Sequence, residues 1–343
     1  MQYTLLLWPH ANARYQAETR RLALAELQLM LARVAPEAAA AIDGASDMPC
    51  LKLNCPVPLD DTALSAVRNH SLIYGLFMDR EDGALVPVAG RTPALLGADL
   101  PAILKYKGKT NEMFLHLLLN VALYSGDFWR DENLSFFDPM CGRATAPFIA
   151  LNRGFDAVGA DVDRADLREA ENFFKRYLEY HHYKYNLTRE SRTVRGKKPV
   201  PVTRFETAAT PEDYKNGPRV RLSLANLDAA LAGETFGKSS FHLIACDLPY
   251  GVAHAARPGE AASGGKNWLE TLLAKSLPGL CRLLKPGGSV AMSFNAQTFR
   301  RDRLATLMAE AGLTPLSGGP YEGFEHWVEQ AITRDIVVAR KNP

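Results

Sequence analysis

Short apolar segments alternate with helical patterns from about residue 110 to the end of this 343-residue chain, and this alternation limits its possible folds more than any other feature. Helical patterns cover 111–122, 164–185, 268–284 and 298–311. Strand-like apolar segments cover 134–137, 156–160, 219–224, 241–246, 288–293 and 332–339. Strands separated by helices pair in parallel and are covered on both faces. The sequence therefore predicts an α/β fold with a doubly wound, mostly parallel sheet.

The first hundred residues follow a different pattern. A helical pattern covers 15–34, a second helix begins near Pro58, and strand-like segments cover 3–8, 50–54 and 72–79. The stretch 86–100, which contains Gly, Pro and small residues, is typical of a connector. We therefore predict a smaller N-terminal α+β domain over 1–95, followed by a larger domain over 100–343.

Charge and composition narrow the class of protein. Forty basic and thirty-eight acidic side chains leave a net charge of +2, which does not by itself indicate nucleic-acid binding. No apolar run approaches the about 20 residues that span a bilayer, and no signal-like segment opens the chain, so we expect a cytoplasmic protein with no membrane partner. No structural metal is predicted, and five cysteines are expected to be mostly buried, reduced thiols: Cys50, Cys55, Cys141, Cys246 and Cys281.

A candidate ligand-binding loop follows the first strand of the larger domain. The strand ends at Asp138 and continues as Pro139-Met140-Cys141-Gly142-Arg143-Ala144-Thr145 into a helix. Ligands of doubly wound sheets bind beyond the carboxyl ends of the strands, and Gly142 allows the backbone to approach a ligand closely. The glycine pattern matches neither a dinucleotide fingerprint nor a P-loop. Because Asp138 would repel a pyrophosphate, this strand end favours a cationic or amine-bearing ligand.

A second acidic strand end follows about twenty residues later. Asp161 and Asp163 come directly after the strand 156–160. A carboxylate at this place can accept hydrogen bonds from both hydroxyls of a ribose. The two strand ends together indicate a nucleoside that carries an amine but no pyrophosphate, and S-adenosylmethionine fits that description.

A third candidate motif, Asp247-Leu248-Pro249-Tyr250-Gly251, follows the apolar strand 241–246. Pro249 restricts Leu248 to an extended conformation, so the Leu248 carbonyl can face a cleft beside the Asp247 carboxylate. Two acceptors next to the Tyr250 ring suit a planar ring that carries an exocyclic amino group. The sequence therefore predicts four catalytic residues: Asp247, Leu248, Pro249 and Tyr250.

These motifs, Asp138-Pro139-x-Cys141-Gly142-x-x-Thr145 and Asp247-x-Pro249-Tyr250-Gly251, resemble those of Rossmann-fold S-adenosylmethionine-dependent methyltransferases that modify exocyclic amines. Within that group, the chain is most similar to RNA guanine-N2 methyltransferases of the tRNA position 10/11 type, which are often fused to a THUMP domain. The resemblance covers about 100–343 and includes the turn Lys285-Pro286-Gly287-Gly288. It implies a seven-stranded Rossmann-like sheet, preceded by a ferredoxin-like domain with an RNA-binding or positioning role.

The resemblance also implies roles for individual residues. Asn226 lies about where the family reads the adenine amino group, and its amide oxygen can accept that hydrogen bond. Arg143 and Ala144 replace a frequent Thr-Gly pair, and Leu248 replaces a proline of many members. The implied cofactor-binding residues are Asp138, Pro139, Cys141, Gly142, Thr145, Asp161, Asp163, Asn226 and Asp247.

Residues in two segments are candidates for contacts with an RNA substrate, most directly tRNA. The segment 105–111 precedes an apolar helix and contributes Lys107, Lys109, Thr110 and Asn111. By the resemblance, it lies where the family places residues that contact the methionine end of the cofactor or the substrate. The segment 188–221 interrupts the strand–helix alternation, is predicted to be a long irregular insertion, and contributes Arg195, Lys197, Lys198 and Arg204. A second irregular stretch, 252–267, could close over a flipped base. A helix cap and a solvated charged surface are the alternative interpretations of the two basic segments.

Three other functions are compatible with parts of this pattern. A DNA adenine-N6 or cytosine-N4 methyltransferase would use the same Asp-x-Pro-Tyr chemistry, but no separate target-recognition domain is evident. A protein glutamine methyltransferase prefers Asn at position 247. An RNA-binding module with a degenerate cofactor cleft would be consistent with Asn226 and Arg143, although the three strand-end acids are intact.

Overall fold

The computed structural model describes residues 1–9, 13–43, 48–194, 196, 198–250 and 267–343. The chain forms two compact units. The first contains 1–93, 295–300 and 316–336, and the second contains 94–294, 301–315 and 337–343. The first unit thus includes segments from the C-terminal part of the chain in addition to the residues that the sequence assigned to an N-terminal domain.

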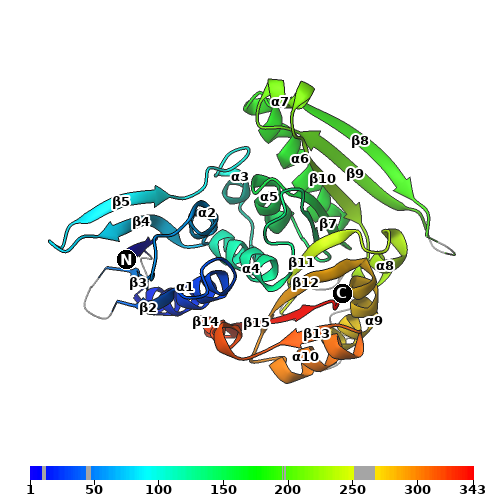
Figure 1. Ribbon diagram of the computed structural model, residues 1–343. Helices are drawn as coiled ribbons and strands as arrows, with labels where there is room; N and C mark the ends of the chain where they lie inside the picture. Colours follow the sequence, from blue (N-terminus) through cyan, green and yellow to red (C-terminus); the bar gives the residue numbers. More distant parts are fainter. Residues whose placement is uncertain (10–12, 44–47, 195, 197, 251–266) are drawn as a thin grey trace. The chain divides into compact units, whose positions relative to one another are not determined.

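A five-stranded antiparallel sheet lies at the centre of the first unit, in the order β2-β3-β1-β4-β5 (Figure 1). Leu5 of β1 pairs with Leu51 of β3, and both side chains are completely buried. Because side chains of a strand alternate between its two faces, such pairs place the apolar residues of neighbouring strands on the same face. Helices α1 (Ala13–Val34) and α2 (Asp61–Arg68) pack together beside this sheet. The strands are β1 (Gln2–Leu7), β2 (Ala39–Ile42), β3 (Cys50–Asn54), β4 (Ile73–Asp79) and β5 (Leu85–Gly90).

The expected strands and helices of this region are found to within a few residues, with two differences. The stretch 86–100 is not only a connector, because β5 covers most of its first part and α3 (Leu100–Ile103) begins at its end. Strand β2 was not expected, since a run of alanines has a low β propensity. It forms because its backbone pairs with β3 along the edge of the sheet.

The second sheet has ten strands, of which β14 (His326–Glu329) pairs only with β15. The order of the other nine strands is β13-β15-β12-β11-β6-β7-β10-β9-β8 (Figure 1). The sequence predicted a mostly parallel sheet of seven strands. That prediction is wrong in number and in kind, because this sheet has ten strands and is mixed. The strands are β6 (Ser135–Asp138), β7 (Asp156–Asp161), β8 (Tyr185–Arg192), β9 (Val200–Thr207), β10 (Val220–Asn226), β11 (Phe241–Asp247), β12 (Leu284–Asn295), β13 (Thr314–Leu316) and β15 (Ile332–Arg340).

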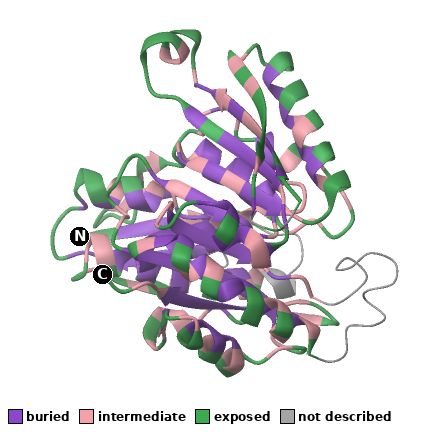
Figure 2. Cartoon of the chain, turned by 90° about the vertical axis from the view of Figure 1, so that its right-hand side faces the viewer, coloured by how far each residue is buried: buried purple, intermediate pink, exposed green. Residues whose placement is uncertain are grey.

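The five central strands, β12-β11-β6-β7-β10, are all parallel, as the sequence predicted. They are largely buried (Figure 2). Helices α5 (Thr145–Asn152) and α6 (Arg164–Tyr180) cover one face of this sheet and α9 (Trp268–Leu283) covers the other (Figure 1). This is the arrangement that the general right-handedness of crossovers predicts, because the chain reverses its direction across the sheet after β10. The remaining helices are α4 (Glu112–Ser125), α7 (Pro211–Asn216), α8 (Ala232–Thr235) and α10 (Arg301–Glu310), with short 3₁₀ helices η1 (Ala229–Leu231) and η2 (Gly319–Glu322).

The basic segment 188–221 is not an irregular insertion. Most of it is a regular hairpin, β8–β9, that extends the sheet beyond β10, followed by α7 and the start of β10. Helix α6 also ends at Tyr180, earlier than the expected end at 185, because Tyr185 already begins β8. Between them, His182 has a positive φ of 58°, which ends the helical conformation. Among the described residues, no helix has both the length and the apolarity that crossing a membrane requires.

Candidate functional site

The three acids that the sequence placed at strand ends are the final residues of three neighbouring strands. Asp138 ends β6, Asp161 ends β7 and Asp247 ends β11. In the sheet, β6 lies between β11 and β7, and the chain turns back across β6 after β10. Such a reversal of strand order opens a crevice at the carboxyl ends of the strands, where α/β proteins bind ligands. The topology therefore brings the predicted site residues to one edge at the position where a ligand is expected.

Asp138 is the most deeply buried of the three acids, with 4% of its surface exposed. Burial, together with the nearby Asp161 and Asp247 carboxylates, raises the pKa of its carboxyl to about 8, against hydrogen bonds from the Met140 amide and the Cys246 thiol that lower it. The Met140 N–H donates to Oδ1 at 3.0 Å. Asp138 is therefore largely protonated at neutral pH, and a cation placed beside it would favour its ionised form.

Asp161 ties the loop after β6 to the end of β7. Its Oδ2 accepts a hydrogen bond from the Gly142 N–H at 2.8 Å, and its Oδ1 accepts one from the Asp163 N–H at 2.8 Å. Burial raises the pKa of this carboxyl as well. Asp163 has a different place, because its Oδ1 caps α6 by accepting from the Ala165 and Asp166 amides. The sequence analysis grouped Asp163 with the cofactor-binding residues, whereas in the structure its side chain is the N-cap of α6.

The loop between β6 and α5 adopts left-handed backbone conformations at two positions. Gly142 has a φ of 50°, and no atom beyond its own neighbours in the chain lies within 4 Å of the place where a Cβ would stand. Ala144 has a φ of 65°, which costs a residue with a Cβ about 1–2 kcal/mol. The loop thus keeps its turn although Ala144 stands where a glycine is frequent, and it leaves open space in front of Gly142.

The other predicted residues of this loop are buried within it. Pro139 and Cys141 are buried, and the Cys141 N–H donates to the Ala160 carbonyl at 2.9 Å. Burial and the nearby Asp138 raise the pKa of the Cys141 thiol well above its usual value, so it stays protonated. Thr145 is the first residue of α5, and its hydroxyl lies 3.4 Å from the Tyr106 hydroxyl.

Asn226 ends β10, next to the end of β7. Its Nδ2 donates to the carbonyls of Asp161 and Val162, each at 3.0 Å. Since a carbonyl can only accept, this arrangement shows that the NH₂ end of the amide points toward the backbone of Asp161 and Val162. The Oδ1 is left as the atom that can accept a hydrogen bond from a ligand, which is the role that the sequence assigned to it.

Three hydroxyl groups surround the Asp247 carboxylate. Thr110 donates to Oδ2 at 2.5 Å, and both Tyr250 and Ser293 donate to Oδ1. The next residue, Leu248, has a buried side chain, and its N–H donates to the Ser293 carbonyl at 2.9 Å. Hydrogen bonds to neighbouring residues therefore hold Asp247, Leu248 and Tyr250 in place. Gly251 and the stretch 252–266 lie outside the described residues.

The predicted substrate residues before α4 divide into different roles. Thr110 reaches Asp247, whereas Asn111 caps α4 by accepting from the Met113 amide at 2.8 Å. Lys109 is turned inward, with its Nζ 2.7 Å from the Pro101 carbonyl and in an ion pair with Glu112. Lys107 is exposed. The alternative interpretation, a helix cap, therefore describes Asn111.

The basic hairpin reaches the same edge of the sheet as the three acids. Because β9 is antiparallel to β10 and β8 is antiparallel to β9, β8 runs in the direction of the parallel strands, and Arg192 at its end lies on the side of Asn226. The Arg192 guanidinium stacks on the buried Phe236 ring at 4.9 Å. Packing of this kind fixes the end of the hairpin against the core of the second unit.

The described arginines of the basic segment 188–221 are paired with acids. Arg204 forms an ion pair with Glu190 at 3.2 Å, Arg189 pairs with Glu171, and Arg219 pairs with Glu206 at 2.7 Å. Lys198 is exposed, and Arg195 and Lys197 lie outside the described residues. The positive charge that the hairpin offers to a polyanion is thus smaller than its composition implied.

Two residues of the site escaped the sequence analysis. Ser293 lies opposite Asp247 in the parallel pairing of β11 and β12, and this register was the only signal that could have identified it. Tyr106 was noted only as part of its segment. Its ring lies 4.7 Å from the Arg143 guanidinium, which also pairs with Asp166 at 2.8 Å, so the segment before α4 contacts the loop after β6.

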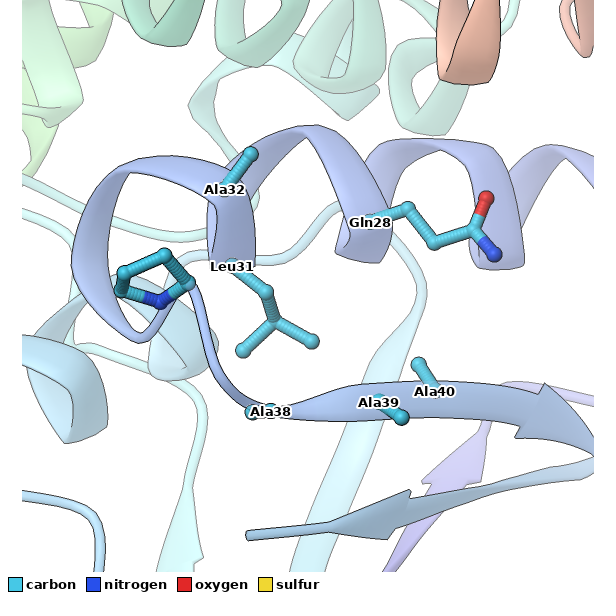
Figure 3. Close-up of a pocket in the computed structure, with 7 residues that line it drawn as sticks. Gln28, Leu31, Ala32, Ala38, Ala39 and Ala40 are labelled. Atoms are coloured by element: carbon cyan, nitrogen blue, oxygen red, sulfur yellow. The ribbon is translucent and has the colours of Figure 1, made fainter. Parts of the chain in front are cut away.

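The described residues contain no group of three or more His, Cys, Asp or Glu side chains that could hold a metal ion. A pocket of about 220 Å³ lies in the first unit between α1 and β2 and is lined by Gln28, Leu31, Pro36 and several alanines. Figure 3 shows the lining side chains. None of these side chains titrates, so the pocket offers no group for acid–base or nucleophilic chemistry.

No family model matches the chain, and no curated protein matches it. Solved structures do match. A methyltransferase from Pyrococcus furiosus is 16% identical, with a TM-score of 0.42 over 72% of this chain and 94% of that one. The N-methyltransferase NodS from Bradyrhizobium japonicum is 13% identical, with a TM-score of 0.37 over 67% of this chain and 95% of that one.

A third match is 1,6-didemethyltoxoflavin-N1-methyltransferase from Burkholderia thailandensis, solved with bound 1,6-didemethyltoxoflavin and S-adenosylhomocysteine. It is 16% identical, with a TM-score of 0.35 over 63% of this chain and 82% of that one. Likenesses as distant as these three leave the function to be inferred from the chemistry of the site itself.

Proposed function

We propose that the chain is an S-adenosylmethionine-dependent methyltransferase that acts on an exocyclic amine of a nucleic-acid base, with guanine N2 in tRNA or another structured RNA as the acceptor. The observation that carries this proposal is the placement of Asp138, Asp161 and Asp247 on three neighbouring strand ends at the reversal of strand order. Asp247 opens the sequence Asp-Leu-Pro-Tyr, which combines acceptors with an aromatic ring.

The residues around β6 and β7 fit the proposed cofactor. Asp138 suits the cationic methionine end, because its buried carboxyl gains most from a nearby positive charge. Asp161 can accept hydrogen bonds from ribose hydroxyls, and the Asn226 Oδ1 can accept one from the adenine amino group. The open space at Gly142 allows a ligand to approach the backbone. When bound, S-adenosylmethionine would supply a methyl group activated by a sulfonium.

The residues around Asp247 would orient the acceptor amine. A carboxylate is far too weak a base to remove a proton from an aromatic amine beforehand, so Asp247 acts by orienting the amine and by receiving its proton after transfer. The Leu248 carbonyl is a second acceptor beside it, and the Tyr250 ring can stack on the base. Holding two reactants in line contributes about 7–11 kcal/mol to such reactions.

Support for RNA as the acceptor comes from the motif resemblance and from the hairpin that ends at the same edge of the sheet. The exposed Lys107 and Lys198 can contact phosphates. The ion pairs of the arginines in 188–221 weaken this support, because charges already neutralised by acids attract a polyanion less.

Methyl transfer from labelled S-adenosylmethionine to separate pools of tRNA, rRNA and DNA, followed by nucleoside mass spectrometry, tests the proposal. We expect N2-methylguanosine in an RNA pool. Asp247→Ala should abolish transfer while cofactor binding, measured by calorimetry, is retained, and the surface variant Asp82→Ala should behave as wild type. Label only in DNA would exclude RNA as the acceptor, and binding without any label would exclude base methylation.

A further inference from the structure

The Asp247 carboxylate accepts hydrogen bonds from hydroxyl groups in three separate parts of the second unit. Tyr250 belongs to the same motif, Thr110 comes from the segment before α4, and Ser293 comes from β12. Oδ1 accepts from Tyr250 and Ser293, and Oδ2 accepts from Thr110. Since a carboxylate has about four acceptor positions, the chain's own hydroxyls occupy most of them. The carboxylate can rotate only by giving up at least one of these bonds.

Ser293 is unusual for its position in the sheet. It is completely buried in a central strand, between the buried Met292 and Phe294, where an apolar β-branched residue would pack well. A buried hydroxyl costs free energy unless it is hydrogen-bonded. Its donation to Asp247 satisfies that requirement, and its backbone carbonyl accepts the Leu248 N–H at 2.9 Å. One residue of β12 thus holds both the Asp247 side chain and the backbone that follows.

Thr110 holds the same carboxylate through its other oxygen. It directly precedes Asn111, the N-cap of α4, whose side chain accepts from the Met113 amide, so its backbone is fixed by the start of a well-packed helix. Ser293 therefore donates to Oδ1 and Thr110 donates to Oδ2, and the two residues come from segments that are distant in sequence.

We propose that Ser293 and Thr110 are positioning residues, which set the orientation of the Asp247 carboxylate for the acceptor amine without touching the substrate themselves. The proposal rests on the function proposed above. Loss of the Thr110 hydroxyl removes its hydrogen bond to Oδ2, and loss of the Ser293 hydroxyl removes one of the two hydroxyl bonds to Oδ1, so that in either variant the carboxylate turns away from the acceptor more easily. Because a misplacement of about 1 Å at a reacting group can slow a reaction about 100-fold, we expect each loss to lower kcat about 10-fold or more, with little change in KM for either substrate.

The variants Ser293→Ala and Thr110→Val test this arrangement. Ser289→Ala is a matched control, since Ser289 is also a buried serine of β12 but donates to the Ala122 carbonyl rather than to Asp247. Thr110→Ser keeps a hydroxyl and should restore most of the kcat that Thr110→Val loses. We expect all four variants to bind S-adenosylmethionine as wild type does. An unchanged kcat in Ser293→Ala, or the same loss in Ser289→Ala, would overturn the proposal.

A second measurement, on the protein without cofactor, does not depend on methyl transfer. Urea unfolding of Ser293→Ala, Asp247→Ala and the double variant forms a double-mutant cycle. Direct contact predicts strong non-additivity: the shift in midpoint caused by Ser293→Ala should largely vanish once Asp247 is absent. Ser289→Ala should shift the midpoint equally in both backgrounds. Additive shifts for Ser293 would show that its hydroxyl does not hold Asp247, whereas coupling without any methyl transfer in wild type would refute the proposed function alone.

Discussion

The burial of Asp138 leads to a quantitative prediction about stability. Its pKa of about 8 in the folded protein lies above the ordinary value of 3.8, so the folded state binds this proton more tightly than the unfolded state does. As pH rises from about 4 to about 8, the unfolded chain ionises this carboxyl first, and folding loses stability. Above the folded pKa both states are ionised and the loss stays constant. At about 1.4 kcal/mol for each pH unit, the full loss is about 6 kcal/mol, as an upper bound.

Asp138→Asn removes the ionisation while keeping the size of the side chain and an oxygen that can accept from the Met140 amide. We therefore expect the variant to be more stable than wild type at pH 8, with a difference that shrinks steadily toward pH 4. Urea unfolding of both proteins across this range measures the difference directly, and other titrating groups cancel from it. The same variant should bind S-adenosylmethionine more weakly, because the charge that matches the cation is gone.

Asp156→Asn serves as the control for this experiment. Burial also raises the pKa of Asp156, but this residue begins β7 at the opposite edge of the sheet and bonds to Arg221. Its replacement should leave cofactor affinity unchanged. If the unfolding free energies of wild type and Asp138→Asn ran parallel between pH 4 and pH 8, the carboxyl would not be buried in its neutral form, and the reasoning would be refuted.

Two further predictions concern residues around the strand ends. Tyr250→Phe keeps the ring and removes one of the three hydroxyls that donate to Asp247. Methyl transfer should therefore fall less than in Tyr250→Ala, which also loses stacking worth about 1–3 kcal/mol. Equal rates in the two variants would contradict a stacking role. Gly142→Ala and Gly154→Ala both place a Cβ at a positive φ with open space around it, so both should lose about 1–2 kcal/mol of stability. Only Gly142→Ala should weaken binding of S-adenosylmethionine in calorimetry, and an equal effect of Gly154→Ala would argue against a ligand at Gly142.

The parts of the site that the sequence predicted are those encoded within a few residues. Asp138 and Asp247 each follow an apolar segment directly, so both the strand and the acid at its end are visible in one short stretch. The parallel core follows from the alternation of such segments with helices. Ser293 was not predicted, because its partner lies 46 positions away and only the register between β11 and β12 brings the two together.

The hairpin β8–β9 shows a different reason for a wrong prediction. Arg189, Glu190 and Arg192 lie on β8, a strand in which no residue is fully buried, so no run of buried apolar side chains marks it as a strand. Its partner β9 does carry buried residues, Val202 and Phe205, but they lie among charged neighbours and were interpreted as part of a charged run. Pairing with β10, rather than local propensity, makes this segment regular.

The same hairpin determines how the large sheet ends. Strand β8 is its outermost strand, and its backbone would be able to pair with a strand of another molecule. Arg189, Glu190 and Arg192 make that edge charged, and the ion pairs of Arg189 with Glu171 and of Glu190 with Arg192 and Arg204 keep it ordered. Replacing these residues with apolar ones would leave the parallel core intact but give the protein an edge prone to aggregation, so the hairpin's charges protect its solubility whatever substrate the site accepts.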